Sequence, residues 1–238
     1  MRRPSKEAIA AWVLASEVLG MALLGAAILS AEHTPRPNST AVIASPPTGV
    51  SSPTPSPAAA AVPIAPPTKV TIAALGIEAP VSPYTAAEAA RGADGVTGKP
   101  CLVNGVITCV DPASVLNVSW QIGGVAGVAF GSAPGTVSTG TVYLYGHAAT
   151  GAKAVFNDLG KLKPGDPATV TTASGKLTYR VQRTVDTAKS AFVSTPEAID
   201  QVPGRLLLIS CDHRPGAKLV NGGYSTGNLI VVLQLEKP

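Results

Sequence analysis

Two residues in the second half of the chain have the types and the placement that thiol chemistry requires. Cys211 ends the apolar run 206–210 and precedes the polar segment 212–216, so we expect it where a buried strand opens into a loop. A side chain at such a position is both rigidly held and accessible. Free cysteine is also among the most buried residue types, so position alone leaves an inert core thiol as an equal alternative.

Histidine is the side chain suited to managing the proton of an attacking thiol near neutral pH. His147 follows the strand-like run 142–146 and precedes a loop of small residues, so its placement matches that of Cys211. His213 lies in the loop directly after Cys211 and could face the same site, but we interpret it as a surface residue. His33 belongs to a proline-rich segment, which leaves His147 as the first candidate and His213 as the second.

The chain has three cysteines, and an odd number leaves at least one thiol without a disulfide partner in the same chain. Cys101 and Cys109 flank Asn104-Gly105, a dipeptide typical of two-residue hairpin turns. We predict a disulfide between these two cysteines. The turn sets position 101 opposite 108, so the pair requires a bulge or a diagonal geometry. Two unpaired small apolar side chains are the alternative, and Cys211 is the expected free thiol.

The N-terminal part of the chain differs in composition from the rest. Residues 8–31 form a mostly apolar run that as a helix would reach about 36 Å, enough to cross a hydrocarbon core of about 30 Å. Basic residues before this run predict a cytoplasmic N-terminus and an exported remainder. A cleaved signal peptide is the alternative, and it too exports the domain. We expect a signal anchor over 1–32, a disordered Pro/Ser/Ala-rich linker over 33–68 and a folded domain over 69–238 on the outer side of the cell membrane.

The segment that follows the linker consists of short strand-like runs separated by turn residues. Charged residues make up 13% of the chain and aromatic residues 4%, with 24 glycines and 22 prolines, which favours a turn-rich β protein over a helical bundle. The pattern predicts short helices near 85–91, 112–115, 153–159 and 196–199. It predicts strands near 70–75, 139–145, 168–172, 176–186, 205–210 and 229–235. We therefore expect a mostly β fold, a closed or nearly closed barrel with short helical inserts.

Charge and ligand spacing exclude two classes of function. The net charge is only +4, and no basic run occurs in the domain, whereas nucleic-acid binding needs clustered lysine and arginine. The cysteines and histidines lack the paired spacing of zinc ligands. We expect no nucleic-acid partner, no metal and no cofactor.

At this point the residues resemble a known family, the sortases. Residues 208–211, Leu-Ile-Ser-Cys, are similar to the Thr-Leu-x-Thr-Cys strand end of sortases, with Ser in place of the second Thr. Residues 143–166 resemble the histidine segment of that family, and the Gly-His, Phe, Leu and Lys-Pro-Gly-Asp spacing there resembles class E and F enzymes of high-GC Gram-positive bacteria. Segments 74–81 and 117–120 also match, so the resemblance covers nearly all of 69–238.

The resemblance implies an eight-stranded β-barrel and a cysteine transpeptidase. It implies that Cys211 attacks a Thr-Gly bond in an LPxTG-like sorting signal and forms a thioacyl enzyme, with His147 as the partner of the thiol. An amine of the cell wall or of a pilin would then resolve the thioacyl enzyme. The partners implied are thus sorting-signal peptides of surface proteins and an amine acceptor.

One departure from the family concerns the substrate carbonyl oxygen. Sortases place an arginine on the strand after the cysteine loop, and the corresponding stretch 224–232 contains none. Arg214 on the cysteine loop and Asn228 near the family position are candidates for the missing oxyanion or substrate-binding role. The missing arginine also supports an alternative function, a sortase-like binding or scaffold module that does not turn over.

Overall fold

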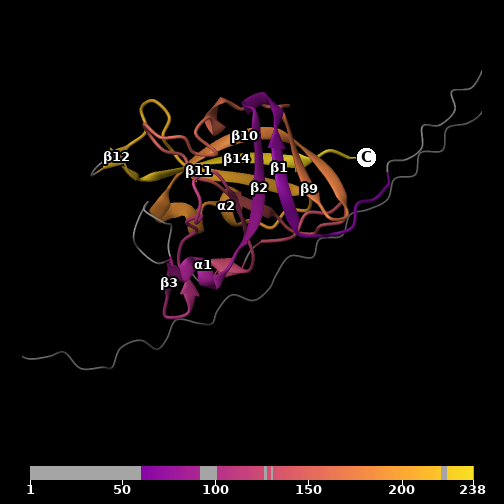
Figure 1. The fold of residues 1–238 in the computed structure, drawn as a ribbon, viewed down its shortest axis with the longest axis horizontal. Coiled ribbons are helices and arrows are strands. Elements are labelled where there is room, and N and C mark those ends of the chain that lie inside the picture. Colours follow the sequence, from indigo (N-terminus) through magenta and orange to yellow (C-terminus); the bar gives the residue numbers. More distant parts are fainter. Residues whose placement is uncertain (1–59, 92–100, 126–127, 130, 221–223, 238) are drawn as a thin grey trace, which may run out of the picture. The chain divides into compact units, whose positions relative to one another are not determined.

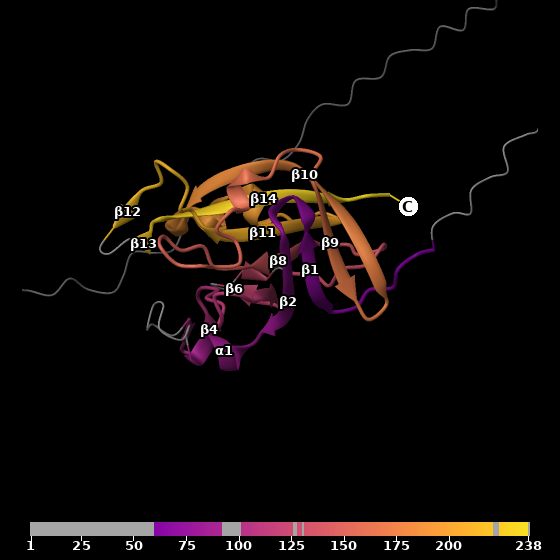
Figure 2. The same cartoon turned by 45° about the horizontal axis from the view of Figure 1, so that its top comes forward.

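The computed structural model describes residues 60–91, 101–125, 128–129, 131–220 and 224–237. A closed barrel has the strand order β1-β2-β5-β8-β11-β14-β10-β9, and β9 pairs with β1 to complete it (Figures 1 and 2). Its strands are β1 Pro67–Ile72, β2 Ile77–Tyr84, β5 Val118–Gln121, β8 Val142–Tyr145, β9 Pro167–Thr172, β10 Gly175–Ala188, β11 Arg205–Cys211 and β14 Gly227–Leu235. The mostly β, eight-stranded barrel predicted from the sequence is confirmed.

Short helices and two-stranded ribbons fill the connections between the barrel strands. They are η1 Ala73–Leu75, α1 Ala86–Arg91, β3 Leu102–Val103, β4 Val106–Ile107, β6 Gly124–Val125, β7 Val128–Ala129, η2 Leu159–Lys161, η3 Lys189–Ser194, α2 Pro196–Ile199, β12 Leu219–Val220 and β13 Tyr224–Ser225. The helices predicted near 85–91 and 196–199 are present as α1 and α2.

Two other helix predictions differ from the structure. The helix predicted near 112–115 is wrong, because the carbonyl of Pro112 contacts a histidine ring and that of Val115 accepts a hydrogen bond from the Val155 N–H at 2.8 Å. These long-range bonds replace the local bonds of a helix. The segment 153–159 forms turns, and only the short helix η2 begins at its end.

Both faces of the central strands are buried. Leu144 of β8 and Leu208 of β11 belong to the cluster inside the barrel, whereas Tyr145 and Ile209 belong to a second cluster on the outer face. Phe192 of η3 packs on this outer cluster, with its ring centroid 6.5 Å from that of Tyr145. Strands buried on both sides read as continuous apolar runs, which explains the run 206–210.

The ordered packing begins before the predicted boundary at residue 69. β1 begins at Pro67. Val62 exchanges two hydrogen bonds with Thr136, from its N–H to Oγ1 at 2.8 Å and from the Thr136 N–H to its carbonyl at 2.9 Å. The end of the proline-rich segment is therefore part of the folded domain.

The predicted membrane segment 8–31 and most of the predicted linker lie outside the described residues. Among the residues that the structure describes, no helix has the length and apolarity needed to cross a bilayer.

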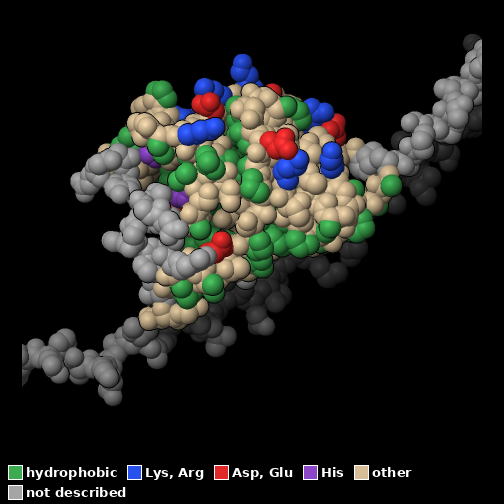
Figure 3. Space-filling model, viewed as in Figure 1, with side chains coloured by type: hydrophobic (Ala, Val, Ile, Leu, Met, Phe, Trp, Pro, Cys, Tyr) green, Lys and Arg blue, Asp and Glu red, His purple; other side chains and the backbone are tan. Residues whose placement is uncertain are grey.

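Charges of both signs are mixed on the face of the domain in Figure 3, where Lys and Arg side chains lie beside Asp and Glu. Ion pairs of this kind include Lys69 with Glu78 at 2.6 Å and Arg180 with Glu236 at 3.2 Å. Such a mixed surface differs from the clustered basic face by which nucleic-acid binding is recognised.

Candidate active site

The register of two neighbouring strands brings Cys211 and His147 to the same end of the barrel. β8 and β11 are parallel, with Tyr145 opposite Ile209, and the N–H of Gly146 donates to the Ile209 carbonyl at 3.0 Å. His147 lies two residues after Tyr145, and Cys211 lies two residues after Ile209. Neighbouring strands lie about 4.8 Å apart, and residues two apart share a face. Cys211 therefore continues the outer face of β11 that carries Ile209, and His147 begins the loop at the same end of β8.

Cys211 is a free, half-buried cysteine at the last position of β11. Its neighbour Ser210 is 3% exposed, so the chain changes from buried to accessible at this residue. Across the sheet, Cys211 pairs with Asn228 of β14. The position has the combination of a fixed backbone and an accessible side chain that a nucleophile needs.

His147 is held tightly at the start of the loop after β8. Its side chain is only 8% exposed, and its carbonyl accepts a hydrogen bond from the Phe156 N–H at 2.9 Å. A Cβ on the preceding Gly146 would lie 2.5 Å from the Phe156 ring, so only glycine permits this close approach.

The imidazole of His147 contacts the segment that precedes β5. Nε2 lies 2.7 Å from the carbonyl oxygen of Pro112 and 3.6 Å from Oδ1 of Asp111. A carbonyl oxygen only accepts hydrogen bonds, so Nε2 carries the proton and donates. The lone pair of the neutral ring is then on Nδ1, which is free of this contact.

The predicted disulfide between Cys101 and Cys109 is present. Asn104 and Gly105 have positive φ angles of 50° and 77° and form the predicted hairpin turn between β3 and β4. The Thr108 N–H donates to the Cys101 carbonyl at 2.7 Å, so 101 lies opposite 108. The disulfide then joins positions offset by one, with a Cα–Cα distance of 5.0 Å. This is the diagonal geometry that the turn position required.

His213 connects the two loops that follow β8 and β11. Its Nδ1 lies 2.9 Å from Oγ1 of Thr150, which belongs to the loop after His147. Burial is the main cause that lowers the pKa of His213, and the positive charge of Lys189 acts in the same direction. A neutral His213 is therefore favoured near pH 7, and its contact orients the loops.

Arg214 is engaged by two carboxylates. Its Nε lies 2.9 Å from Oδ1 of Asp212, its Nη2 lies 3.0 Å from Oδ2 of the same residue, and Nη2 also pairs with Asp186. The hydrogen bond from Arg214 lowers the pKa of Asp212 below its usual range. Asp186 pairs with Leu229, whose side chain lies inside the barrel, so this cluster lies across the sheet from Asn228.

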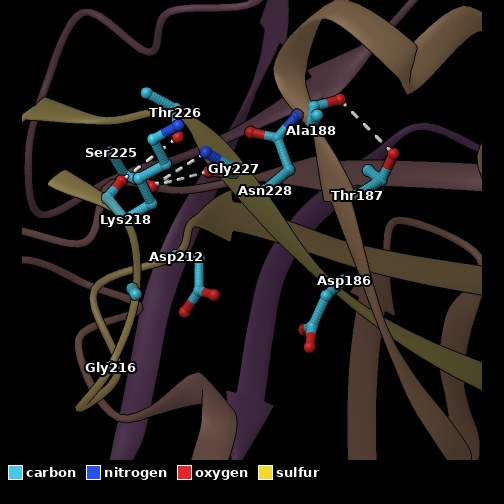
Figure 4. A pocket seen from close by; sticks show the side chains of 11 residues that line it. Asp186, Thr187, Ala188, Asp212, Gly216, Lys218, Ser225, Thr226, Gly227 and Asn228 are labelled. Carbon is cyan, nitrogen blue, oxygen red and sulfur yellow. Dashed lines mark hydrogen bonds between the residues drawn. The ribbon is translucent and has the colours of Figure 1, made fainter. Parts of the chain in front are cut away.

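Asn228 shares the face of Cys211. It is the cross-strand partner of Cys211 on one side and of Thr187 on the other. Figure 4 shows its side chain on one side of the strand and the carboxylates of Asp186 and Asp212 directed to the other. One surface pocket borders Asn228, and its lining also includes Thr187, Asp186 and Asp212. Of the two candidates, Asn228 thus lies directly across from the thiol.

No metal-binding arrangement of three or more His, Cys, Asp or Glu side chains occurs within the described ranges. The residues at the barrel end are a thiol, an imidazole and amide or carbonyl groups, which are suited to acyl transfer.

The contacts of Asp111 and Pro112 were missed by the sequence reasoning. The available signal was their position two and three residues after Cys109, in a segment that the disulfide anchors. A residue before proline is also biased away from helix, which would have opposed the helix predicted there.

Comparison with known proteins identifies the family. A sortase domain model matches residues 106–236, more than half of the chain. Solved structures similar to the chain include sortase C-1 from Actinomyces oris, at 16% identity over 71% of this chain and 72% of that chain with a TM-score of 0.42. Sortase A from Corynebacterium diphtheriae matches at 14% identity over 76% of this chain and 64% of that chain, with a TM-score of 0.45. A search of curated protein sequences found no match.

The domain match covers more than half of the chain, and the family assignment rests on it alone. It includes β8 and the His147 that follows it, and β11 with Cys211. The chain belongs to the sortase family.

Proposed function

We propose that this chain is a cysteine transpeptidase in which Cys211 is the nucleophile and His147 is its proton partner. Membership of the sortase family indicates a cysteine transpeptidase in general. The observation that supports the residue assignment is the register of β8 and β11, because the two strands are parallel neighbours that end just before His147 and at Cys211.

The proposed reaction has two acyl transfers. The thiol proton of Cys211 passes to His147 as the sulfur attacks the carbonyl carbon of the substrate threonine, the C–S bond forms, and the peptide C–N bond breaks. The leaving amine takes its proton from the imidazolium of His147. An amine acceptor then attacks the thioester, the new amide C–N bond forms, the C–S bond breaks, and the acceptor's proton passes to His147 or the released thiolate.

Charge develops on the substrate carbonyl oxygen in both transfers, so a hydrogen-bond donor is needed there. We assign this role to the side-chain amide of Asn228, which is the cross-strand neighbour of Cys211. Arg214 is assigned a structural role in this proposal, because its guanidinium binds Asp212 and Asp186 on the other face.

The substrate class and the cellular setting follow from sequence features. We propose an LPxTG-like sorting signal as the donor and a cell-wall or pilin amine as the acceptor, as the resemblance to class E and F sortases over 143–166 implies. The apolar run 8–31 supports a single membrane anchor with a cytoplasmic N-terminus, and the proline-rich segment after it supports an extended tether to an extracytoplasmic domain.

A panel of LPxTG and LAxTG peptides tests the proposal. The full chain in detergent is incubated with each peptide, with and without an oligoglycine amine, and Cys211 is examined for a thioacyl adduct by mass spectrometry. An adduct with an amine-dependent product supports the transpeptidase, and an adduct that only hydrolyses indicates a protease-like enzyme. Cys211→Ala is the negative control.

The alternative function rests on the substitution of the family arginine. Asn228 occupies the strand position opposite Cys211, and an amide carries no charge to hold a substrate oxygen. Binding of a peptide without any adduct on Cys211 would support a sortase-like binding or scaffold module in place of the enzyme.

A further inference from the structure

The segment 109–116, here called the strap, joins the disulfide hairpin to β5 and contacts His147 on its way. It is held at its beginning by the disulfide of Cys109. In its middle the Asp111 N–H donates to the Tyr84 hydroxyl at 3.2 Å. Near its end the Val115 carbonyl accepts from the Val155 N–H at 2.8 Å. A segment held at three places has little freedom to move away from the imidazole.

The strap presents two different oxygens to one nitrogen of His147. The Pro112 carbonyl lies 2.7 Å from Nε2, which is hydrogen-bond distance, and Oδ1 of Asp111 lies 3.6 Å from the same atom. The side chains of His147 and Asp111 are 8% and 12% exposed, so little water separates the carboxylate from the ring. Charges in such a site act more strongly on each other than on an open surface.

We propose that Asp111 is a positioning residue for His147, and that the strap supplies the third member of a Cys211, His147, Asp111 arrangement. The inference rests on the proposed function and extends it. The Pro112 carbonyl fixes the Nε2–H tautomer and leaves the Nδ1 lone pair for the proton of the thiol. When His147 becomes an imidazolium, the nearby carboxylate of Asp111 stabilises the positive charge, as the acidic residue of other nucleophile–histidine systems does.

The hydrogen bond that sets the tautomer of His147 is accepted by the backbone carbonyl of Pro112, whereas the charge that stabilises its imidazolium comes from the side chain of Asp111. A substitution of Asp111 can therefore test the second role while the first remains. Asp111→Asn keeps the size of the side chain and the Pro112 carbonyl but removes the charge. We expect it to lower kcat about tenfold, equal to about 1.4 kcal/mol, with KM changed less than about twofold. Asp111→Glu restores a carboxylate and should recover part of kcat. Glu236→Gln, which removes an exposed carboxylate paired with Arg180, is the matched control and should leave kcat unchanged.

The tautomer of His147 gives a readout that needs no substrate. Long-range proton–nitrogen NMR spectra are recorded on the full chain in detergent carrying Cys211→Ala, which removes proton transfer from the thiol. They are compared with spectra of the same chain carrying His147→Gln, which assigns the signals. The expected signature is a protonated Nε2 and an unprotonated Nδ1 in His147. A ring with its proton on Nδ1 would overturn the inference.

The outcomes distinguish this inference from the proposed function. If wild-type chain forms no adduct with any peptide, the proposed function fails, whereas the NMR spectra still test the orientation of His147 by the strap. If adducts form and Asp111→Asn retains wild-type kcat, the positioning role of Asp111 is refuted. If Asp111→Asn loses activity only because its thermal transition is also lost, and if Asp111→Glu does not restore activity, then Asp111 has a structural role alone.

Discussion

Substitution of Asn228 tests which group supports the substrate oxygen. In Asn228→Ala the donor opposite Cys211 is removed, while the strand pairing of β14 with β10 and β11 stays. Loss of one preorganised oxyanion donor typically costs about 3 to 4 kcal/mol. Asn228 is half-buried and its amide is uncharged, so we expect a smaller loss of about 1.4 to 2.7 kcal/mol, or about 10-fold to 100-fold in kcat. Asn228→Asp should be at least as damaging, because its negative charge opposes the developing oxyanion.

Arg214→Ala is the matched comparison, because it removes a charge that two carboxylates already engage. Its hydrogen bonds to Asp212 are charge-assisted, but the Arg214 side chain is 35% exposed and Asp186 is 61% exposed, so solvent screens much of the gain. We expect the free energy of unfolding to fall by about 1 to 2 kcal/mol and kcat by less than about threefold.

The stability effect of Arg214→Ala should depend on pH in a defined direction. The hydrogen bond from Arg214 lowers the pKa of Asp212, so the contribution of this pair is present above the unfolded value of about 4 and is lost as pH falls through the folded value. The difference in unfolding free energy between wild type and Arg214→Ala should therefore shrink below about pH 4.

Steady-state kinetics and urea unfolding on the same preparations decide between the two residues. The reasoning is refuted if Arg214→Ala loses tenfold or more in kcat at unchanged stability, with Arg214→Lys recovering part, while Asn228→Ala remains near wild type. Asn228→Arg, which returns a guanidinium to the strand opposite Cys211, should retain or exceed the activity of wild type if the face has been assigned correctly.

The remaining predictions concern the nucleophile, its partner and the disulfide. Cys211→Ala should abolish the thioacyl adduct with little change in the thermal transition, and cleavage that survives this change would disprove the assignment. His147→Ala should be comparably inactive and His213→Ala should stay within a few-fold of wild type; the reverse order in peptide cleavage would move the role to His213. Removing the disulfide by Cys101→Ser with Cys109→Ser should lower the unfolding free energy by about 2 to 3 kcal/mol, and three alkylatable thiols in non-reduced wild-type protein would contradict the pairing.

Short sequence patterns predicted the strands and the turn whose formation depends on neighbouring residues. All six strands expected from apolar runs are present as β1, β8, β9, β10, β11 and β14. The Asn104-Gly105 turn and its disulfide were also predictable, because a two-residue turn sets which residues face each other across the hairpin. In these cases the information lies within a few residues of the element.

Two barrel strands, β2 and β5, were not recognised from the apolar pattern. β2 contains Pro80 and Pro83, which weaken a strand pattern, and β5 has only four residues, Val118–Gln121. Both form because they pair with each other and with the flanking strands β1 and β8. Their stability comes from the closed sheet, so no short sequence window contains it.

The strap shows why the surroundings of the histidine escaped sequence reasoning. The pattern near 112–115 favoured a helix, but the backbone there bonds to His147, which lies 35 residues beyond Pro112. The residues that fix the imidazole were therefore assigned to an element that does not form. A nucleophile and a base can be recognised from residue type and strand position, whereas the groups that orient them depend on long-range contacts.

The two candidates to replace the missing family arginine, Arg214 and Asn228, also show that long-range contacts escape sequence reasoning. Arg214 is three residues from Cys211 in sequence, which suggested that it could fold back over the site, yet one of its carboxylate partners, Asp186, comes from β10, 28 residues earlier. Asn228 is 17 residues away but directly opposite Cys211, because β11 and β14 pair in antiparallel register. Alternation along β14 separates the face of Asn228 from the face of Leu229 and the arginine cluster. Sheet register, rather than distance along the chain, therefore determines which donor can reach an oxygen bound at the sulfur.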